Sequence, residues 1–311
     1  MYPGADNPGF GSFVKHQVDG LRAFGHKVDV LYIHGYRSKL NYLKAIFTIF
    51  KYTWKGCYDV VHAHYGLSAI PCLFRWRTSL VITFHGSDVL QGSTQPLISK
   101  LVCQFANAVI VVSDKMNSII AGKVIPCGVD LEVFKPYNLN EARTRLGIAM
   151  SRKVILFPFD PRRKVKRYKM AEAVVDKLRR SGQDVELLVA FGIRNDEMPW
   201  YYSAANAMIL CSISEGSPTS VKEALACNLP VVSTDVGDVK EIMKGIRGSF
   251  VCEDNVDVIT QCLEQILAGE DRSIFESRSY MERYNMRKTV ESILMVYESA
   301  IQKNTGMGQY S

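Results

Sequence analysis

The sequence predicts an α/β protein with two doubly wound domains, and three observations carry this prediction. Short apolar runs rich in β-branched residues alternate with helical patterns, which is typical of parallel sheets covered on both faces. The alternation starts again after about residue 150, so the same series occurs twice. A chain of 311 residues gives room for two domains of ordinary size.

Each element follows from its local pattern, because apolar runs predict buried strands and longer amphipathic stretches predict helices. In the first series we expect strands at 28–33, 59–62, 80–84 and 108–112, and helices at 11–24, 40–54, 67–75 and 96–105. In the second series we expect strands at 153–157, 185–190, 207–211, 230–233 and 249–252, and helices at 168–180, 218–227, 256–267 and 286–302. The polar stretch 130–146, which contains Pro136, is expected as the linker.

The beginning of the chain departs from this scheme. A glycine-containing loop follows Met1 almost directly, although a doubly wound domain needs a strand before that loop. The sequence leaves no room for this strand, so we expect the first strand to be missing here. Because loss of a central strand would expose strand edges and core, we expect the natural protein to begin about ten residues upstream.

Composition and charge narrow the classes of function. Hydrophobic residues make up 47% of the chain and charged residues 22%, which excludes an intrinsically disordered or low-complexity protein. The net charge of +7 lies in residues 1–150, where 16 Lys and Arg face 9 Asp and Glu. This excess predicts an acidic partner for the first half, such as a membrane surface or an anionic substrate, or it serves solubility alone.

Two further features bear on location. The eight cysteines form no CxxC pair and no signal peptide is evident, which predicts a reducing cytoplasm and no zinc site. No apolar run reaches the roughly 20 residues of a membrane span. The nearest stretch, 42–54, is interrupted by Lys44 and Lys51 and indicates an amphipathic helix, which either lies on a membrane or packs on its own domain.

The stretch 214–227 contains most of the candidate binding residues in the second series. It follows an apolar strand and enters a helix, so the backbone N–H groups of residues 216–220 are expected to form an anion site at the helix N-terminus. Glu215 and Glu223 lie on either side of this site, where one carboxylate can accept bonds from sugar hydroxyls and the other can bind a ribose. The alternative is a capped helix with two surface glutamates.

A basic cluster, 162–169, directly follows the predicted strand 153–157. At the carboxyl end of a parallel strand it is expected to face a ligand crevice, where its charge suits a diphosphate. A solvated face or a nucleic-acid patch would have the same composition. One tyrosine without a stacking platform argues against nucleic acid.

Three histidines end neighbouring strands of the first series. His62 and His64 close one strand and His85 the next, so all three are expected near one edge of the sheet. A neutral histidine can donate or accept a hydrogen bond beside a reacting sugar. A structural role and a three-histidine metal site are the alternatives, and the metal site lacks a matching carboxylate pattern.

Taken together, these motifs resemble family 4 glycosyltransferases, which are retaining enzymes of the GT-B fold. The resemblance rests on 215–223 with its extension to Glu241, on 83–88, on 124–130 and on the loop 9–11, and it covers nearly the whole chain. It implies two Rossmann-like domains that face a central crevice, at 1–135 on the acceptor side and at 136–285 for the nucleotide sugar. It also implies that the C-terminal segment 286–311 forms a helix that crosses back to the first domain.

The resemblance implies a role for each matching residue. It makes His85, Glu215 and Lys166 catalytic, and it assigns the donor to the following residues: Gly9, Gly11, Arg162, Arg163, Lys166, Glu215, Gly216, Ser217 and Glu223. Acceptor-side candidates are His62, His64 and Asp88. The stretch 157–161 lacks the family's usual glycine, which leaves the choice between Arg162 and Arg163 open.

The implied activity is transfer of a sugar from a nucleoside diphosphate sugar to an acceptor hydroxyl, with retention, in the assembly of a surface polysaccharide or glycolipid. No cofactor, metal or nucleic acid is implied, and the acceptor would be a sugar or a lipid-linked glycan. The enzyme would be cytoplasmic, with peripheral contact to the inner face of the membrane through the basic first domain. The alternatives are a degenerate nucleotide-sugar binder without transfer activity, and an epimerase or phosphorylase on the same fold.

Overall fold

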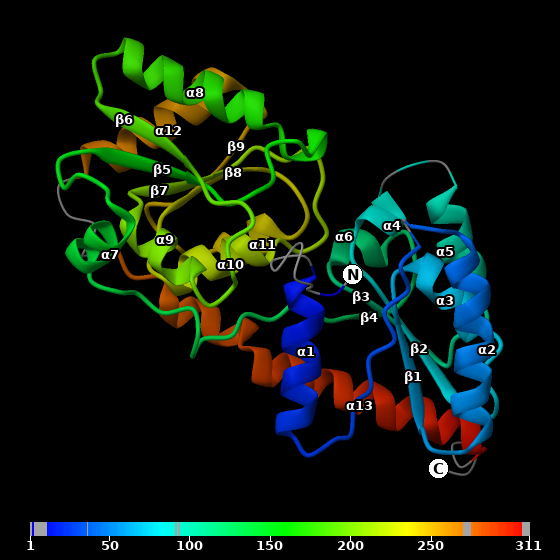
Figure 1. Ribbon diagram of the computed structural model, residues 1–311. Helices are drawn as coiled ribbons and strands as arrows, with labels where there is room; N and C mark the ends of the chain where they lie inside the picture. The colour runs from blue at the N-terminus through cyan, green and yellow to red at the C-terminus, as the bar shows by residue number, and fades with distance from the viewer. Residues whose placement is uncertain are drawn as a thin grey trace. The chain divides into compact units, whose positions relative to one another are not determined.

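The computed structural model describes residues 2, 11–35, 37–90, 92, 94–269 and 275–306. Their contacts divide the chain into two compact units, and each unit contains one parallel sheet (Figure 1). The first unit holds residue 2, residues 14–127 and the described residues from 287 onward. The second holds residues 128–286 together with residues 11–13.

The sheet of the first unit has parallel strands in the order β1-β2-β3-β4. These strands are β1 (Val60–His64), β2 (Ser79–Phe84), β3 (Ala108–Val111) and β4 (Lys123–Val124). All six residues of β2 are buried, as expected for a strand covered on both faces. Leu80 and Ile82 pack into the core on one face, whereas Val81 packs into a second core on the other.

Helices cover both faces of this first sheet. Six of them come before the second unit: α1 (Ser12–Ala23), α2 (Leu40–Trp54), α3 (Gly66–Cys72), α4 (Ser87–Leu90), α5 (Gln95–Cys103) and α6 (Asp114–Asn117). α2, α3 and α5 are neighbours in one layer (Figure 1). On the opposite face, α13 (Met286–Thr305) packs against Val81 and Ile110, and the hydroxyl of Ser79 donates to the carbonyl of Ala300 at 3.1 Å. The last helix therefore contributes to the core of the first unit.

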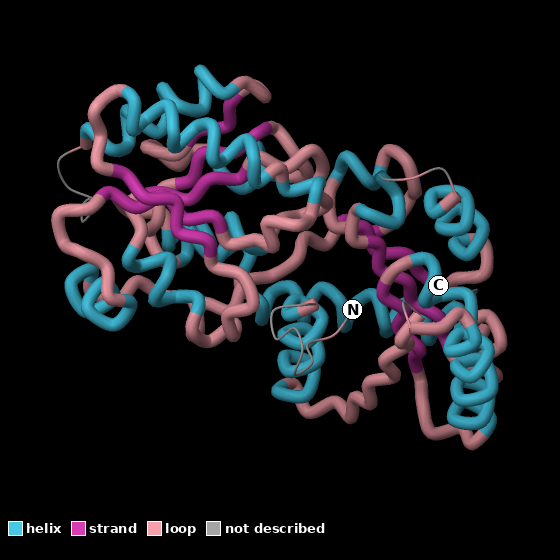
Figure 2. The backbone as a smooth tube through the Cα atoms, turned by 45° about the horizontal axis from the view of Figure 1, so that its top comes forward, coloured by secondary structure: helices cyan, strands magenta, loops and turns pink. Residues whose placement is uncertain are grey.

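The second unit has a five-stranded parallel sheet in the order β6-β5-β7-β8-β9. Its strands are β5 (Lys153–Phe157), β6 (Val185–Val189), β7 (Ala207–Leu210), β8 (Val231–Thr234) and β9 (Phe250–Cys252). Its helices are α7 (Leu139–Leu146), η1 (Lys164–Lys166), α8 (Tyr168–Arg180), α9 (Met198–Ala204), α10 (Thr219–Ala226), α11 (Val239–Met243), α12 (Val256–Ala268) and η3 (Arg278–Tyr284). α8 packs on α12 at one face of the sheet, and α9, α10 and α11 cover the other, which is the doubly wound pattern (Figures 1 and 2).

Two expectations about elements are wrong. Residues 28–33 form no strand, and β1 is the edge of the described sheet, so this segment joins no sheet that the structure describes. The polar stretch 130–146 is not a simple linker, since it contains α7 and belongs to the second unit. The side chain of Asn138 caps α7 by accepting from the backbone N–H groups of Asn140 and Glu141.

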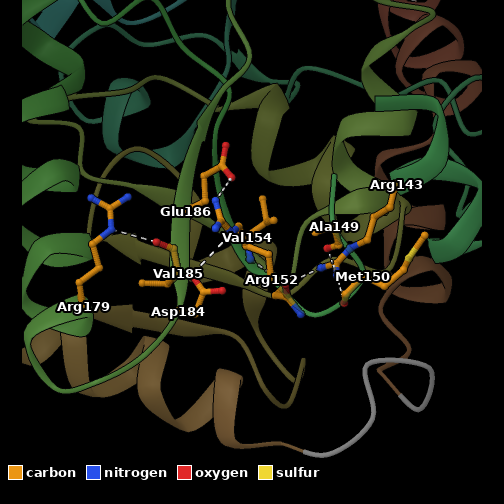
Figure 3. A network of polar contacts seen from close by, with 10 residues as sticks. Arg143, Ala149, Met150, Arg152, Val154, Arg179, Asp184, Val185 and Glu186 are labelled. Carbon is orange, nitrogen blue, oxygen red and sulfur yellow. Dashed lines mark hydrogen bonds and ion pairs between the residues drawn. The ribbon is translucent and has the colours of Figure 1, made fainter. Parts of the chain in front are cut away.

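A polar network closes the amino-terminal edge of the second sheet (Figure 3). The buried guanidinium of Arg143 donates to the carbonyls of Ala204, Ala149 and Met150, and to the side-chain oxygen of Asn206. These contacts tie α7 to the loops that lead into β5 and β7. They lie at the end of the strands opposite to their carboxyl ends, so the network supports the fold rather than a ligand site.

Candidate functional site

Sheet topology singles out one edge of the second unit. β5 pairs with β6 on one side and with β7 on the other. The chain leaves β5 toward α8 on one face and leaves β7 toward α10 on the opposite face (Figure 1). In open α/β sheets, ligands bind beyond the carboxyl ends of two such strands, because the loops diverge there.

The loops after β5 and β7 meet at this edge and bring Lys166 and Glu215 together. The backbone N–H of Ile213 donates to the carbonyl of Val165 at 2.9 Å. Lys166 Nζ donates to Glu215 Oε1 at 2.5 Å, and both side chains are largely buried. Burial lowers the pKa of the Lys166 ammonium group, and the Glu215 carboxylate counteracts that effect. Two residues predicted for one site, 49 positions apart in sequence, therefore form one ion pair.

The basic cluster 162–169 does not act as a single surface. Arg162 is exposed and pairs with Asp160 at 2.9 Å, whereas Arg167 pairs with Asp254 at 2.5 Å. Arg163 is exposed, and its charge lowers the pKa of Lys166. Arg163 is thus electrostatically coupled to the buried Lys166–Glu215 pair, whereas the Arg162 guanidinium pairs with the carboxylate of Asp160.

The stretch 216–220, where the sequence predicts an anion site, leads into α10. The helix begins at Thr219, one residue later than expected, and Pro218 precedes it without a side-chain hydrogen bond. Backbone N–H groups of a first helical turn have no partner within the helix, so they are available to an anion. The loop before the helix is held in place by Gly237, where a Cβ atom would lie 2.7 Å from the carbonyl oxygen of Gly216.

Ser217 belongs to a buried polar network that was not predicted from the sequence. Lys222 Nζ donates to Ser217 Oγ at 2.5 Å, and Ser217 Oγ donates to Asp238 Oδ2 at 2.7 Å. Lys222 is fully buried and lies 3.8 Å from the same carboxylate oxygen. The Ser217 hydroxyl has already donated its hydrogen, so Ser217 can offer a ligand its backbone N–H or an oxygen lone pair. Lys222 and Asp238 were missed because one reads as a helix surface lysine and the other as a turn residue.

Glu223 lies inside α10 and is buried. Its Oε2 accepts a hydrogen bond from the hydroxyl of Tyr202, a fully buried residue of α9, at 2.8 Å. Burial raises the pKa of Glu223 to about 7, although Tyr202, Thr219 and Lys222 counteract it. The carboxyl group is therefore poised between its neutral and charged forms near physiological pH.

The three histidines of the first unit do lie together. His64 Nδ1 is 2.9 Å from His85 Nε2, and the rings of His62 and His64 stack with centroids 4.4 Å apart. Both nitrogens of His62 are engaged, Nδ1 by the hydroxyl of Tyr297 and Nε2 by that of Thr83, each at 2.7 Å. Burial lowers the pKa of His62 and of His85 to about 3 and that of His64 well below its usual range, so all three rings are neutral.

Asp88 shapes the loop that carries His85. Its Oδ1 accepts from the backbone N–H groups of His85 and Gly86, at 3.1 and 3.0 Å. Burial raises the pKa of Asp88 to about 6, and these N–H groups counteract it. Tyr65, at a positive φ of 73°, places its ring 4.8 Å from that of His85. A non-glycine residue at positive φ next to this half-buried histidine pair is a feature that functional sites often show.

The remaining predicted residues are placed as follows. Gly11 directly precedes α1 with a φ of 74°, and Gly9 lies outside the described residues. Across the part of the chain that the structure describes, no group of three or more His, Cys, Asp or Glu is arranged to hold a metal ion. No helix in that part is long and apolar enough to cross a bilayer.

Two family models match the chain, one in each half. Residues 18–133 match the model described as Glycosyltransferase Family 4, and residues 164–269 match the model described as Glycosyl transferases group 1. The chain belongs to glycosyltransferase family 4. Both clusters described above fall within the matched ranges, with His85 in the first and the Lys166–Glu215 pair in the second. The predicted family is confirmed.

Relatives of this family 4 chain are distant in sequence and similar in fold. The putative teichuronic acid biosynthesis glycosyltransferase TuaC of Bacillus subtilis is 28% identical over 217 residues, which cover 59% of this chain and 55% of that protein. The chain thus spans little more than half the length of this relative. Sucrose-phosphate synthase from Thermosynechococcus elongatus matches 94% of this chain and 93% of its own, with a TM-score of 0.74 at 19% identity.

A second solved structure, Anabaena HepE in complex with UDP, matches 96% of this chain and 98% of its own, with a TM-score of 0.70 at 16% identity. These likenesses show that the family 4 chain has the GT-B fold, so the predicted fold class is confirmed.

Proposed function

We propose that this protein is a retaining glycosyltransferase, which moves a sugar from a nucleoside diphosphate sugar to an acceptor hydroxyl. The observation that carries the proposal is the buried Lys166–Glu215 pair at the diverging ends of β5 and β7. Family membership and solved neighbours of the same fold that bind UDP support it.

For the donor, we propose that the diphosphate binds at the N-terminus of α10. Lys166 and Arg163 then supply positive charge as the diphosphate departs, and one preorganised donor of this kind is worth roughly 3–4 kcal/mol of transition-state stabilisation. Arg163 is preferred to Arg162, because Arg162 is held by Asp160. Once Lys166 turns to the phosphate, Glu215 is free to accept hydrogen bonds from sugar hydroxyls. Glu223 is proposed to bind the ribose.

For the reaction, we propose attack of the acceptor oxygen on the same face from which the diphosphate leaves. The bond from the anomeric carbon to the phosphate oxygen breaks, the bond to the acceptor oxygen forms, and the leaving phosphate takes the acceptor proton. We propose that the neutral His85 ring polarises the sugar and that His64 and Asp88 position it. Both nitrogens of His62 are engaged within the unit, which favours a supporting role.

We propose that the reaction needs no metal ion, because Lys166 and Arg163 supply the positive charge that stabilises the departing diphosphate. We propose a cytoplasmic enzyme that glycosylates a sugar or lipid-linked glycan in polysaccharide or glycolipid assembly, in peripheral contact with the membrane. The relationship to a protein named for teichuronic acid biosynthesis and the basic first half of the chain support this assignment.

The test is to incubate the protein with UDP-, GDP-, ADP- and TDP-sugars and simple acceptors, with and without EDTA. The anomeric configuration of any product is read by NMR. We expect one donor class to give a product with the donor's anomeric configuration, at a rate that EDTA leaves unchanged. Inversion would overturn the retaining mechanism. Turnover of the donor without any acceptor would indicate an epimerase, and binding without turnover would indicate a degenerate binder.

A further inference from the structure

Helix α2 of the first unit carries two separate apolar stripes. Ala45, Ile49 and Thr53 recur every four residues and are buried against the unit. A second stripe follows a spacing of three and four residues on another side of the helix and is exposed: Leu40, Leu43, Phe47, Phe50 and Trp54. Because the first stripe already accounts for packing, the second is not needed to hold the helix in place.

The exposure of this second stripe is unusually large. Phe47 is 76% exposed, Leu40 62% and Trp54 58%. The stripe continues onto the loop after α3, where Trp76 lies 4.7 Å from Trp54 between ring centroids. Two of the three tryptophans of the chain therefore share one surface. We call these six residues the aromatic face: Leu40, Leu43, Phe47, Phe50, Trp54 and Trp76.

The charged residues of α2 itself are all basic. Lys44, Lys51 and Lys55 are exposed on α2 and its C-terminal end, beside the exposed stripe. Arg77 lies 5.6 Å from the centroid of the Trp76 ring. Between residues 37 and 58 the sequence contains five basic residues and no acidic one.

We propose that the aromatic face docks the protein on a bilayer that contains anionic lipids. Apolar and aromatic side chains flanked by lysines match the boundary between acyl chains and headgroups, where tryptophan is also preferred. Anionic headgroups complement the surrounding lysines, and each lysine near such a surface adds to the attraction. The inference rests on the proposed function only in giving a reason for docking, namely an acceptor attached to lipid.

The test measures co-sedimentation of the full chain with vesicles of phosphatidylcholine alone, and with vesicles that also contain phosphatidylglycerol. The wild-type protein is expected to bind the anionic vesicles, more weakly as salt rises. Phe47→Ser should weaken binding about tenfold or more, because a full aromatic side chain is lost from the interface. The matched control Met295→Ser removes an apolar residue of α13 that is 69% exposed, and it should bind like wild type.

A second pair of variants tests the charge. Lys44→Gln with Lys51→Gln should weaken binding to anionic vesicles about tenfold or more, whereas Lys115→Gln with Lys123→Gln changes net charge equally and should not. All four substituted lysines are exposed, so the fold is expected to persist, and far-UV circular dichroism checks this.

Failure of the wild-type protein to bind, or equal binding by Phe47→Ser, would overturn the proposal. An oligomer in solution that Phe47→Ser dissociates would assign the aromatic face to a second copy instead. The assay needs no donor or turnover, so its failure leaves the proposed transferase activity standing, and the reverse also holds.

Discussion

Glu223 shows how burial can set the pH response of a single residue. Its carboxyl group lies on α10 beside Tyr202, and burial raises its pKa to about 7. A ribose hydroxyl that donates a hydrogen bond binds the charged form more strongly, and this form becomes dominant only above that pH.

We therefore expect nucleoside diphosphate affinity to rise between pH 6 and pH 8, about the pKa of Glu223, and Glu223→Gln to lose this part of the rise. Stability should respond in the opposite direction. A raised folded-state pKa contributes stability that is complete below the unfolded value of 4.5 and is lost as pH rises toward about 7. Glu223→Gln should consequently gain most relative to wild type at pH 8, as measured by calorimetry and thermal unfolding. An unchanged pH profile in the variant would contradict this assignment.

Lys222 and Asp238 are two buried groups of opposite charge. The two charges lie in the core beneath the loop that carries Ser217, and the Ser217 hydroxyl bridges them. Removing one charge leaves the other buried and unpaired, which typically costs about 3–5 kcal/mol.

Lys222→Met should accordingly destabilise the protein by about 3 kcal/mol and weaken nucleotide binding. The double variant Lys222→Met with Asp238→Asn should recover much of the stability, because no unpaired charge remains. Urea unfolding and calorimetric titration of both variants check this. If the double variant is no more stable than the single one, the two charges do not act as a pair.

Among the elements, the loop before α10 depends on a close approach between two backbone segments. Gly237 has a positive φ of 58°, and a Cβ atom there would lie 2.7 Å from the Gly216 carbonyl oxygen. Gly147 has a similar φ of 68° but open space around its Cα.

Gly237→Ala should therefore displace the 215–217 loop and weaken nucleoside diphosphate binding about tenfold or more, in addition to the backbone strain of about 1–2 kcal/mol. Gly147→Ala should carry the strain alone and keep wild-type affinity. Calorimetric titration separates the two, and equal affinity losses would show that the loop is not positioned by this contact.

The two ends of the second sheet differ in what they do. At the amino-terminal edge, Arg143 donates to three carbonyls and one amide oxygen. Figure 3 shows its contacts with Ala149 and Met150. At the carboxyl edge lies the Lys166–Glu215 pair.

Arg143→Leu should lower the free energy of unfolding by about 3 kcal/mol, because buried acceptors lose charged donors. It should leave nucleotide affinity unchanged at temperatures where the variant is folded. Thermal unfolding measured with calorimetric titration tests both parts, and a matching loss of affinity would place Arg143 in the binding machinery.

For the whole molecule, periodicity and motifs were enough to predict two parallel α/β units and the family. The helices over 40–54 and 168–180 agree with the structure residue for residue, because their apolar spacing is long and regular. Strand pairing cannot be read from such a pattern, and residues 28–33 accordingly look like a strand yet join neither of the described sheets. The helix α7 was missed because its polar composition resembles a linker.

For the candidate site too, residues with a local sequence signal could be predicted, whereas those that depend on tertiary packing could not. Residues with a strong local signal, such as Glu215 after a strand and His85 before a glycine, are the ones that the sequence proposes for the site. Lys222 and Tyr202 were not predicted, because their contacts with Ser217 and Glu223 arise only from tertiary packing. The preference for Arg163 over Arg162 likewise needed the ion pair between Arg162 and Asp160.

We propose that a nucleoside diphosphate binds where β5 and β7 end, with Lys166 opposite its phosphates. We would titrate the wild-type chain and Lys166→Ala with UDP, GDP, ADP and TDP and use the shift in thermal unfolding as the readout. A bound nucleotide at 100 times its Kd should stabilise the wild-type protein by about 2.7 kcal/mol. We predict that one nucleotide does so and that Lys166→Ala loses at least about tenfold in affinity, equivalent to about 1.4 kcal/mol. Wild-type affinity in Lys166→Ala, or no response to any of the four, would contradict the account.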